Sequence, residues 1–226
     1  MSKYDIVLAP VLYMVKPGFA AKLEKYVEAG GTFVTTFFSG IVNENDLVTT
    51  GGYPGELRKL LGIWVEEIDA LLPDQKNSIV LKETYGDLQG EYGCGMLCDL
   101  LHSEGAEVIA EYGDDFYKGM PVVTRNTFGQ GEAWYVASDP DERFLDGLLG
   151  QLAAAKNVES LLETPEGVEV SARTKDGRPY LFVMNHNATT QSYDLGTAKA
   201  HDLLTNRELS GSVEIEARGV QLLEMK

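Results

Sequence analysis

The chain has 226 residues, 44% hydrophobic and 24% charged, a composition typical of a soluble globular protein of one or two domains. Its formal net charge of −16 disfavours nucleic-acid binding, because an acidic surface repels the phosphate backbone. No apolar run approaches the ~20 residues of a membrane helix, and the N-terminus lacks a signal-peptide pattern, so no membrane partner is expected.

The N-terminal segment alternates strand and helix patterns. The apolar run 5–10 predicts a buried strand, and a helical stripe follows Pro17 and Gly18. The β-branched and aromatic residues 32–38 predict the next strand. Strand, helix and strand in this order predict a right-handed crossover and a parallel pair.

The middle of the chain continues as a layered α/β domain. A short Leu-rich helix is expected within 55–62, and short strands are expected at 63–68, 78–82, 107–112, 121–124 and 133–136. Cys94, Leu97, Cys98 and Leu101 recur at helical spacing, which predicts a helix over 92–102.

A final helix of this domain is expected to begin near residue 139. Asp139 fits the N-cap, Pro140 fits the first helical position, and Glu142 completes a capping-box arrangement. The first domain is therefore predicted to span residues 1–163, as a parallel-type sheet with flanking helices.

No helical stripe follows residue 164, and the remaining residues predict strands only. Asp176-Gly177 favours a hairpin between strands at 168–172 and 180–184. Further strands are expected at 202–205, 213–215 and 220–224. Residues 164–226 are thus predicted to form a small antiparallel, sandwich-like β domain.

The most particular stretch is residues 30–62, GGTFVTTFFSGIVNENDLVTTGGYPGELRKLLG. Together with IVLAPVLYMV at 6–15, YGDDFYKGMPVVTRNTFGQG at 112–131 and FVMNHN at 182–187, it resembles the β-galactosidases of glycoside hydrolase family 42. The resemblance implies that residues 1–163 are the family's trimerisation domain, with a class I glutamine amidotransferase-like, flavodoxin-like fold. It also implies that residues 164–226 are the family's C-terminal β domain.

The same resemblance implies that this chain is not the catalytic part. Family members hydrolyse terminal non-reducing β-D-galactosides with retention, using two glutamates of a separate (β/α)8 barrel. No segment here matches that barrel, so we expect a truncated, non-catalytic fragment. Its expected partners are two further copies in a homotrimer and the parent's barrel, and a galactoside only through the parent.

No cofactor or metal site is expected. Cys94 and Cys98 are the only cysteines and lack zinc spacing, and such sparse cysteine usage favours a reducing, cytoplasmic location.

Two other functions are open from the residues. Gly93-Cys94-Gly95 superficially resembles the nucleophile turn of an amidotransferase, but Tyr92 replaces its first glycine and no His-x-Glu pair occurs. A buried, inert Cys94 is the favoured interpretation. Alternatively, Phe37, Phe38, Tyr53 and Trp64 could stack on sugars in a carbohydrate-binding module, although packing explains them more simply.

The polar block after the strand at 32–38 is the best candidate for contacts to a partner. The cluster Asn43-Glu44-Asn45-Asp46 fits a local turn and a subunit junction equally well, and at such a junction it could bind a cation or contact sugar hydroxyls. The predicted interface or active-site-rim residues are Phe38, Ser39, Asn43, Glu44, Asp46 and Tyr53.

Overall fold

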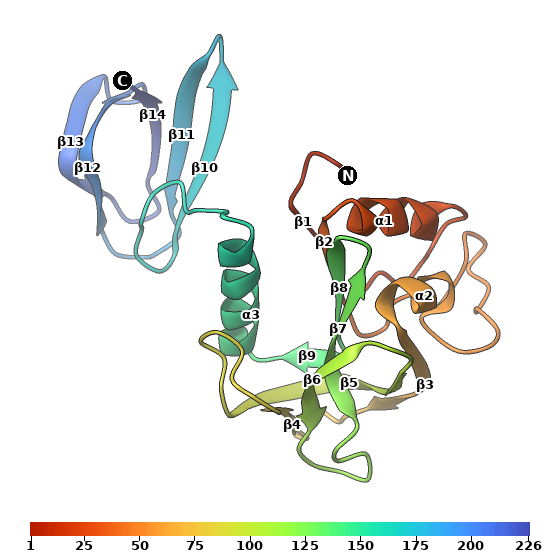
Figure 1. Ribbon diagram of the computed structural model, residues 1–226. Coiled ribbons are helices and arrows are strands. Elements are labelled where there is room, and N and C mark those ends of the chain that lie inside the picture. The colour runs from red at the N-terminus through yellow and green to blue at the C-terminus, as the bar shows by residue number, and fades with distance from the viewer. The chain divides into compact units, whose positions relative to one another are not determined.

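The chain forms two compact units, each with its own sheet. The computed structural model describes residues 1–226 and divides them into Met1–Val158 and Glu159–Lys226 (Figure 1). Each unit also has a hydrophobic core of its own.

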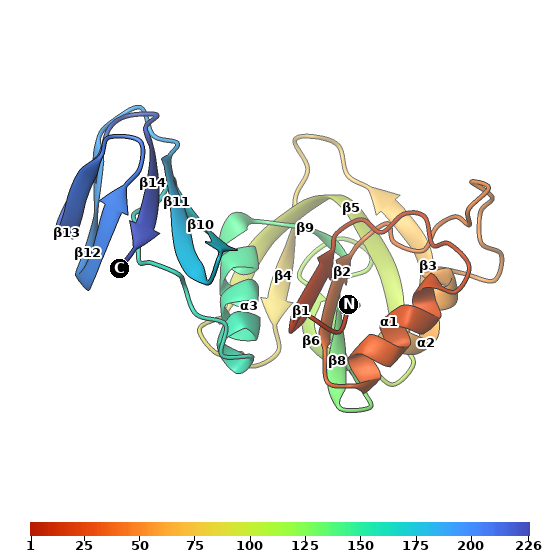
Figure 2. The same cartoon turned by 90° about the horizontal axis from the view of Figure 1, so that it is seen from above.

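The predicted βαβ crossover is present in the first unit. Strand β1 (Ile6–Ala9) leads through helix α1 (Phe19–Glu28) to β2 (Thr32–Thr36), and β1 and β2 pair in parallel. Strand β8 (Gly131–Val136) adds a third parallel strand beside β2. Helices α1 and α3 (Glu142–Ala155) lie on opposite sides of these strands (Figure 2).

The rest of this sheet is antiparallel, which corrects the expectation of a parallel-type sheet. It contains β3 (Ile63–Ala70), β4 (Asn77–Leu81), β5 (Glu91–Ser103), β6 (Glu107–Tyr112) and β7 (Pro121–Phe128). The strand order is β1-β2-β8-β7-β6-β4-β5-β3. A short turn joins β7 to β8, and such a connection allows only antiparallel pairing.

The predicted helix over 92–102 is wrong, because these residues form the long strand β5. Strand β5 pairs with β3 and β4, and also with the short strand β9 (Ser138–Pro140). A register shift between Gly95 and Cys98, with Met96 in the left-handed region (φ 62°), breaks the two-residue alternation. Cys94 and Cys98 are both buried, and so are the adjacent Leu100 and Leu101, so both faces of this part of β5 are covered and its apolar residues do not follow a two-residue alternation.

The other helices are close to their predicted positions. A short 3₁₀ turn, η1 (Gly55–Leu57), leads into α2 (Arg58–Leu61). The N-cap of α3 is Asp141 rather than Asp139, because Ser138–Pro140 is taken up by β9. The Asp141 carboxylate accepts a hydrogen bond from the Phe144 amide (3.0 Å). No helix of the protein is long and apolar enough to cross a membrane.

The second unit is the small antiparallel domain that the sequence predicts. Its strands are β10 (Val168–Lys175), β11 (Arg178–Asn185), β12 (Gln191–Asp202), β13 (Arg207–Ile215) and β14 (Val220–Met225), in the order β10-β11-β14-β12-β13. The Asp176-Gly177 hairpin is confirmed. Strand β12 was not predicted, and residues 203–205, expected as part of a strand, form the turn after it.

Candidate functional site

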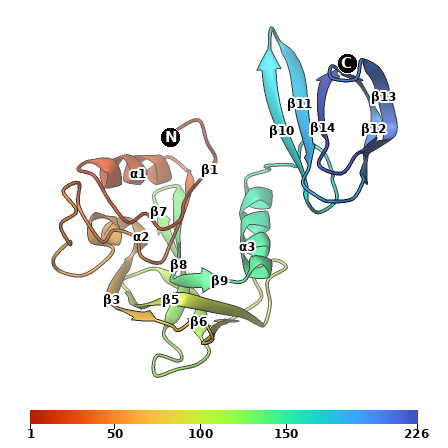
Figure 3. The ribbon, with the colours of Figure 1, turned by 180° about the vertical axis from the view of Figure 1, so that it is seen from behind.

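The predicted contact residues lie in the loop that follows β2, at the carboxyl end of the parallel strands. This loop, residues 37–54, runs beside the β1–α1 loop, residues 10–18 (Figure 3). The Gly40 amide donates to the Leu12 carbonyl (2.9 Å), and the Val15 amide donates to the Val42 carbonyl (3.0 Å). Ligand and partner sites of α/β sheets commonly lie at this end of the strands.

Near its start, at Gly40, the loop backbone passes close to the backbone of Pro54 at the loop's end. The φ of Gly40 is +67°, and a Cβ there would lie 2.1 Å from the carbonyl oxygen of Pro54. Only glycine fits, because both the left-handed backbone and the contact exclude a side chain.

Phe38 and Ser39 have different environments, although they are neighbours. Phe38 is half-buried with φ +58°, and its ring stacks on Tyr13 at 5.4 Å between centroids. Ser39 is fully buried, and its hydroxyl accepts from the Leu12 amide (2.9 Å) and donates to the Thr36 carbonyl (2.6 Å). Ser39 therefore holds the two loops together from inside and is not accessible to a partner.

Asn43 shapes the turn of the loop, as the local alternative suggested. Its carboxamide oxygen accepts from the amides of Asn45 (3.0 Å) and Leu47 (3.1 Å). Asp46 and Glu44 are exposed, and Asp46 accepts from the Tyr13 hydroxyl (3.2 Å). Tyr53 lies where the loop returns, and its backbone pairs with Val65 of β3.

Exposed apolar side chains gather on these two loops and on the edge strand β1. They are Leu8 (50% exposed), Val11, Tyr13, Leu47 (61%) and Val48. Backbone pairing brings the segments of Tyr13 and Val48 together, because Tyr13 precedes the bridge between Met14 and Val42, and Val42 in turn bridges to Val48. We call these five residues the β1–β2 loop surface. Exposed apolar clusters of this kind commonly mark interaction sites.

A buried carboxylate contacts the start of the loop from inside the sheet. It was not predicted from the sequence. Asp99 of β5 is 1% exposed, and its Oδ2 accepts from the Phe38 amide (3.1 Å) and from the Tyr135 hydroxyl. Its Oδ1 has no hydrogen-bond partner. Burial raises the pKa of Asp99 to about 6, although both hydrogen bonds act in the opposite direction. The signal that could have revealed it is an aspartate inside the apolar run Cys98–Leu101.

The cysteines have the buried environment that the sequence favoured. Cys94 and Cys98 are free and at most 2% exposed. The hydrogen bond with Cys98, together with burial, raises the pKa of Cys94, so this thiol stays protonated. His102 lies roughly 20 Å or more along the same strand from Cys94. Its ring binds Glu66 (2.7 Å) and stacks on Trp64, so no Cys–His pair forms.

The four aromatic residues considered for sugar stacking do not form one open platform. Phe37 is buried, and Phe38 stacks on Tyr13. The Trp64 ring stacks on His102 at 5.1 Å, and the Arg58 guanidinium also lies over it at 5.8 Å. These rings are therefore engaged in packing within the chain.

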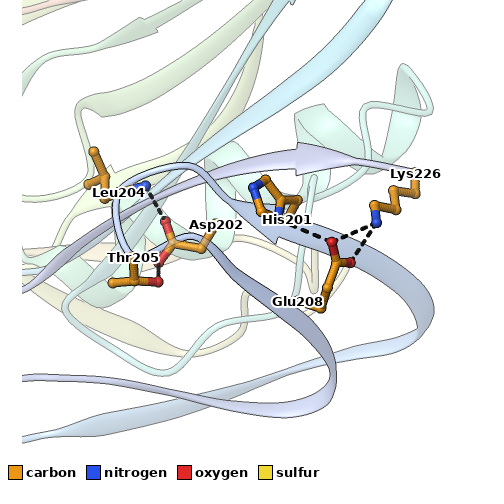
Figure 4. Close-up of polar contacts among 6 residues, drawn as sticks. All are labelled: His201, Asp202, Leu204, Thr205, Glu208 and Lys226. Atoms are coloured by element: carbon orange, nitrogen blue, oxygen red, sulfur yellow. Dashed lines mark hydrogen bonds and ion pairs between the residues drawn. The ribbon is translucent and has the colours of Figure 1, made fainter.

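The second unit carries a polar network where β12, β13 and β14 meet (Figure 4). Asp202 is 1% exposed and accepts from the Leu204 amide (3.0 Å) and the Thr205 hydroxyl (2.5 Å). Glu208 accepts from Lys226 (2.6 and 2.7 Å) and pairs with His201 (3.1 Å). The hydrogen bond from Lys226 lowers the pKa of Glu208.

A groove of about 740 Å³ lies beside this network. Its lining includes four carboxylates (Asp202, Glu208, Glu214 and Glu216) and no aromatic ring. No group of three or more His, Cys, Asp or Glu side chains in the protein could hold a metal ion. The network therefore fixes the ends of the strands, and the groove provides no ring on which a sugar could stack.

The comparison with protein families decides what the two units are. The model of the β-galactosidase trimerisation domain matches residues 1–159, and that of the β-galactosidase C-terminal domain matches residues 167–225. The chain belongs to the β-galactosidases of glycoside hydrolase family 42. The resemblance of residues 6–15, 30–62, 112–131 and 182–187 to this family is thereby confirmed.

Individual relatives agree with this membership. The β-galactosidase BgaP of Planococcus sp. is 60% identical over 99% of this chain and 33% of its own length. The β-galactosidase Pbg of Clostridium perfringens is 42% identical over 100% of this chain and 33% of its own length. The chain thus spans about one third of the length of the curated relatives it matches.

Solved structures show the same fold. The crystal structure of the β-galactosidase from Bacillus circulans sp. alkalophilus matches all of this chain and 33% of that chain, with a TM-score of 0.94 and 61% identity. That of the β-galactosidase from Rahnella sp. matches 99% of this chain and 32% of that chain, with a TM-score of 0.89 and 41% identity.

Proposed function

We propose that this chain is the assembly and C-terminal part of a longer β-galactosidase and catalyses no hydrolysis by itself. The observation that carries the proposal is the match of residues 1–159 to a trimerisation domain, combined with the exposed β1–β2 loop surface in the same unit. The relatives are three times as long, which supports a separate catalytic part in the parent.

In this proposal the parent is a homotrimer in which the β1–β2 loop surface meets a different patch of the next copy. Heterologous contacts of this kind close into a ring when the rotation is threefold. Phe38, Asn43, Glu44, Asp46 and Tyr53 would surround the apolar contact, with Ser39 as internal support. The same face would lie near the parent's barrel, so that three barrels complete one another's clefts.

The parent would hydrolyse terminal non-reducing β-D-galactosides with retention, through two carboxyl groups of its barrel. The protein would be cytoplasmic and would need no cofactor. The three parallel strands between α1 and α3 support an amidotransferase-like origin for the first unit. We place the start of the C-terminal β domain at residue 164.

Exposed leucines provide a matched test of the surface. Leu47 is 61% exposed on the β1–β2 loop surface, and Leu72 is 62% exposed on the loop between β3 and β4. Leu47→Glu should weaken self-association measured by light scattering, because a charge would enter a desolvated contact, and Leu72→Glu should not.

Three results would contradict the proposal. A chain that is monomeric at all concentrations would exclude assembly by this module alone. Loss of association only in Leu72→Glu would place the interface elsewhere. Turnover of a chromogenic β-galactoside by the isolated chain would show that it carries a catalytic site.

A further inference from the structure

The loop after β2 begins in a backbone conformation that non-glycine residues rarely adopt. Phe38 has φ +58°, in the left-handed region. Its amide donates to Asp99 Oδ2 at 3.1 Å, across 61 positions of sequence. Its ring stacks on Tyr13, whose hydroxyl donates to Asp46.

Asp99 itself is held firmly by the sheet. Its amide donates to the Ala137 carbonyl (2.8 Å), at the end of β8. Its carbonyl accepts from the buried Tyr112 hydroxyl (3.2 Å), and its carboxylate accepts from the Tyr135 hydroxyl. A rigid core group is thus hydrogen-bonded directly to the first backbone turn of the loop.

We propose that Asp99 is a positioning residue that holds residues 37–46 in the conformation that presents the β1–β2 loop surface to a second copy of the chain. The inference rests on the proposed assembly function and names how that same surface is controlled. Asp99 touches no partner itself, since it is 1% exposed.

The charge of Asp99 decides how firmly the loop is held. An ionised carboxylate accepts shorter and stronger hydrogen bonds than a neutral acid. Since burial raises the pKa of Asp99 to about 6, the group gains its proton between neutral and mildly acidic pH. Protonation weakens the bond to the Phe38 amide and loosens the loop.

The groups that face Asp99 from the neighbouring elements are few. Tyr135 of β8 and Tyr112 of β6 have pKa values raised well above their usual range by burial, so both stay neutral in this interval. Cys98 precedes Asp99 on β5, and its thiol shares a hydrogen bond with Ser138. The hydrogen bond with Cys94 lowers the pKa of Cys98 to about 6, so Cys98 titrates in the same interval, and its charge raises the pKa of Asp99. The carboxylates of Glu44 and Asp46 lie on the loop itself, and substitution of Asp99 leaves them in place.

The test combines hydrogen exchange with light scattering on the 226-residue chain between about pH 7.5 and pH 5. In the wild type, the protection factor of the Phe38 amide and the association constant should fall together, with a midpoint near 6. Asp99→Asn should remove this midpoint and weaken association at pH 7.5 by at least about fivefold. Asp202→Asn, the matched buried aspartate of the other unit, should keep the midpoint.

The outcomes separate this inference from the proposed function. Unchanged Phe38 protection and association in folded Asp99→Asn would overturn the inference and leave assembly intact. A wild-type chain that stays monomeric while its Phe38 protection titrates would support the role of Asp99 in the loop and overturn assembly. If Asp99→Asn does not fold, the wild-type titration still tests the inference. A protection factor of the Phe38 amide that stays constant across the pH range would exclude the positioning role of Asp99.

Discussion

Two aspartates, one in each unit, are equally buried but have different partners. Asp99 and Asp202 are both 1% exposed. Asp202 uses both oxygens, on an amide and a hydroxyl two and three residues ahead of it, and also accepts from the Leu222 amide of β14 at 3.4 Å. Asp99 uses one oxygen only, and its donors lie 36 and 61 positions away. Burial alone therefore does not decide what a carboxylate does. The two shortest hydrogen bonds of Asp202 come from donors in the following turn, so Asp202 caps that turn, whereas both donors of Asp99 are distant and link a loop to the core.

The largest expected effect is on the turn capped by Asp202. Asp202→Ala leaves the Leu204 amide and the Thr205 hydroxyl without their acceptor and should destabilise the second unit by about 3 kcal/mol. Both tryptophans, Trp64 and Trp134, lie in the first unit, so their fluorescence reports that unit alone. Hydrogen exchange over residues 168–225 should show the loss, while the tryptophan unfolding curve stays unchanged. A shift of the tryptophan curve would show that the effect is not local.

A smaller effect is expected for a donor to Asp99. Tyr135→Phe removes a hydroxyl that binds the buried carboxylate and should cost the first unit about 1–2 kcal/mol at neutral pH. The same change should raise the pKa of Asp99 further, because a hydrogen bond that favours the charged form is lost. Urea unfolding followed by tryptophan fluorescence measures the first effect, and a carboxyl NMR titration measures the second. A lowered pKa would contradict the assigned role of Tyr135.

The pH dependence of stability should distinguish the first unit from its Asp99→Asn variant. The pKa of Asp99 is about 6 in the folded chain against 3.8 for an ordinary aspartate, so the folded state binds the proton more tightly. The stabilisation is complete below the unfolded pKa and is lost as the pH rises through 6. Between about pH 7.5 and pH 5 the wild type should gain about 1.4 kcal/mol relative to Asp99→Asn. Parallel pH profiles of the two chains would contradict a raised pKa.

The smallest effect is expected at the exposed part of the network in Figure 4. Lys226 and Glu208 are more than half exposed, so solvent screens their ion pair. Lys226→Ala should leave hydrogen exchange over residues 168–225 unchanged within error, in contrast to Asp202→Ala in the same unit. A loss as large as that of Asp202→Ala would mean that the ion pair, rather than the capped turn, stabilises this end of the sheet.

Local patterns in the sequence predicted local structure well. The stripe of α1 and the strands β1 and β2 were correctly predicted, and so was the Asp176-Gly177 hairpin. Each depends on side-chain periodicity or turn chemistry within a few consecutive residues, so a short stretch of sequence is enough to predict it. The Asn43 turn in the candidate site belongs to the same class.

The failures have a long-range cause. Residues 92–102 have helical spacing, but β3, β4 and β9 offer backbone partners along their length, and the strand is buried on both faces at Leu100 and Leu101, which removes the two-residue alternation. Tertiary pairing outweighs a local preference of this size. The N-cap of α3 moved from Asp139 to Asp141 for the same reason, since β5 pairs with residues 138–140.

The sequence by itself determined the family and the division into an α/β unit and a β unit, because long motifs and local periodicity are properties of consecutive residues. Only the tertiary structure decided that Ser39 is internal, that Leu8, Val11, Tyr13, Leu47 and Val48 are exposed, and that Asp99 accepts a hydrogen bond from the start of the loop. These features depend on which distant segments lie side by side. That choice follows from strand pairing across the whole sheet and not from any short stretch of residues.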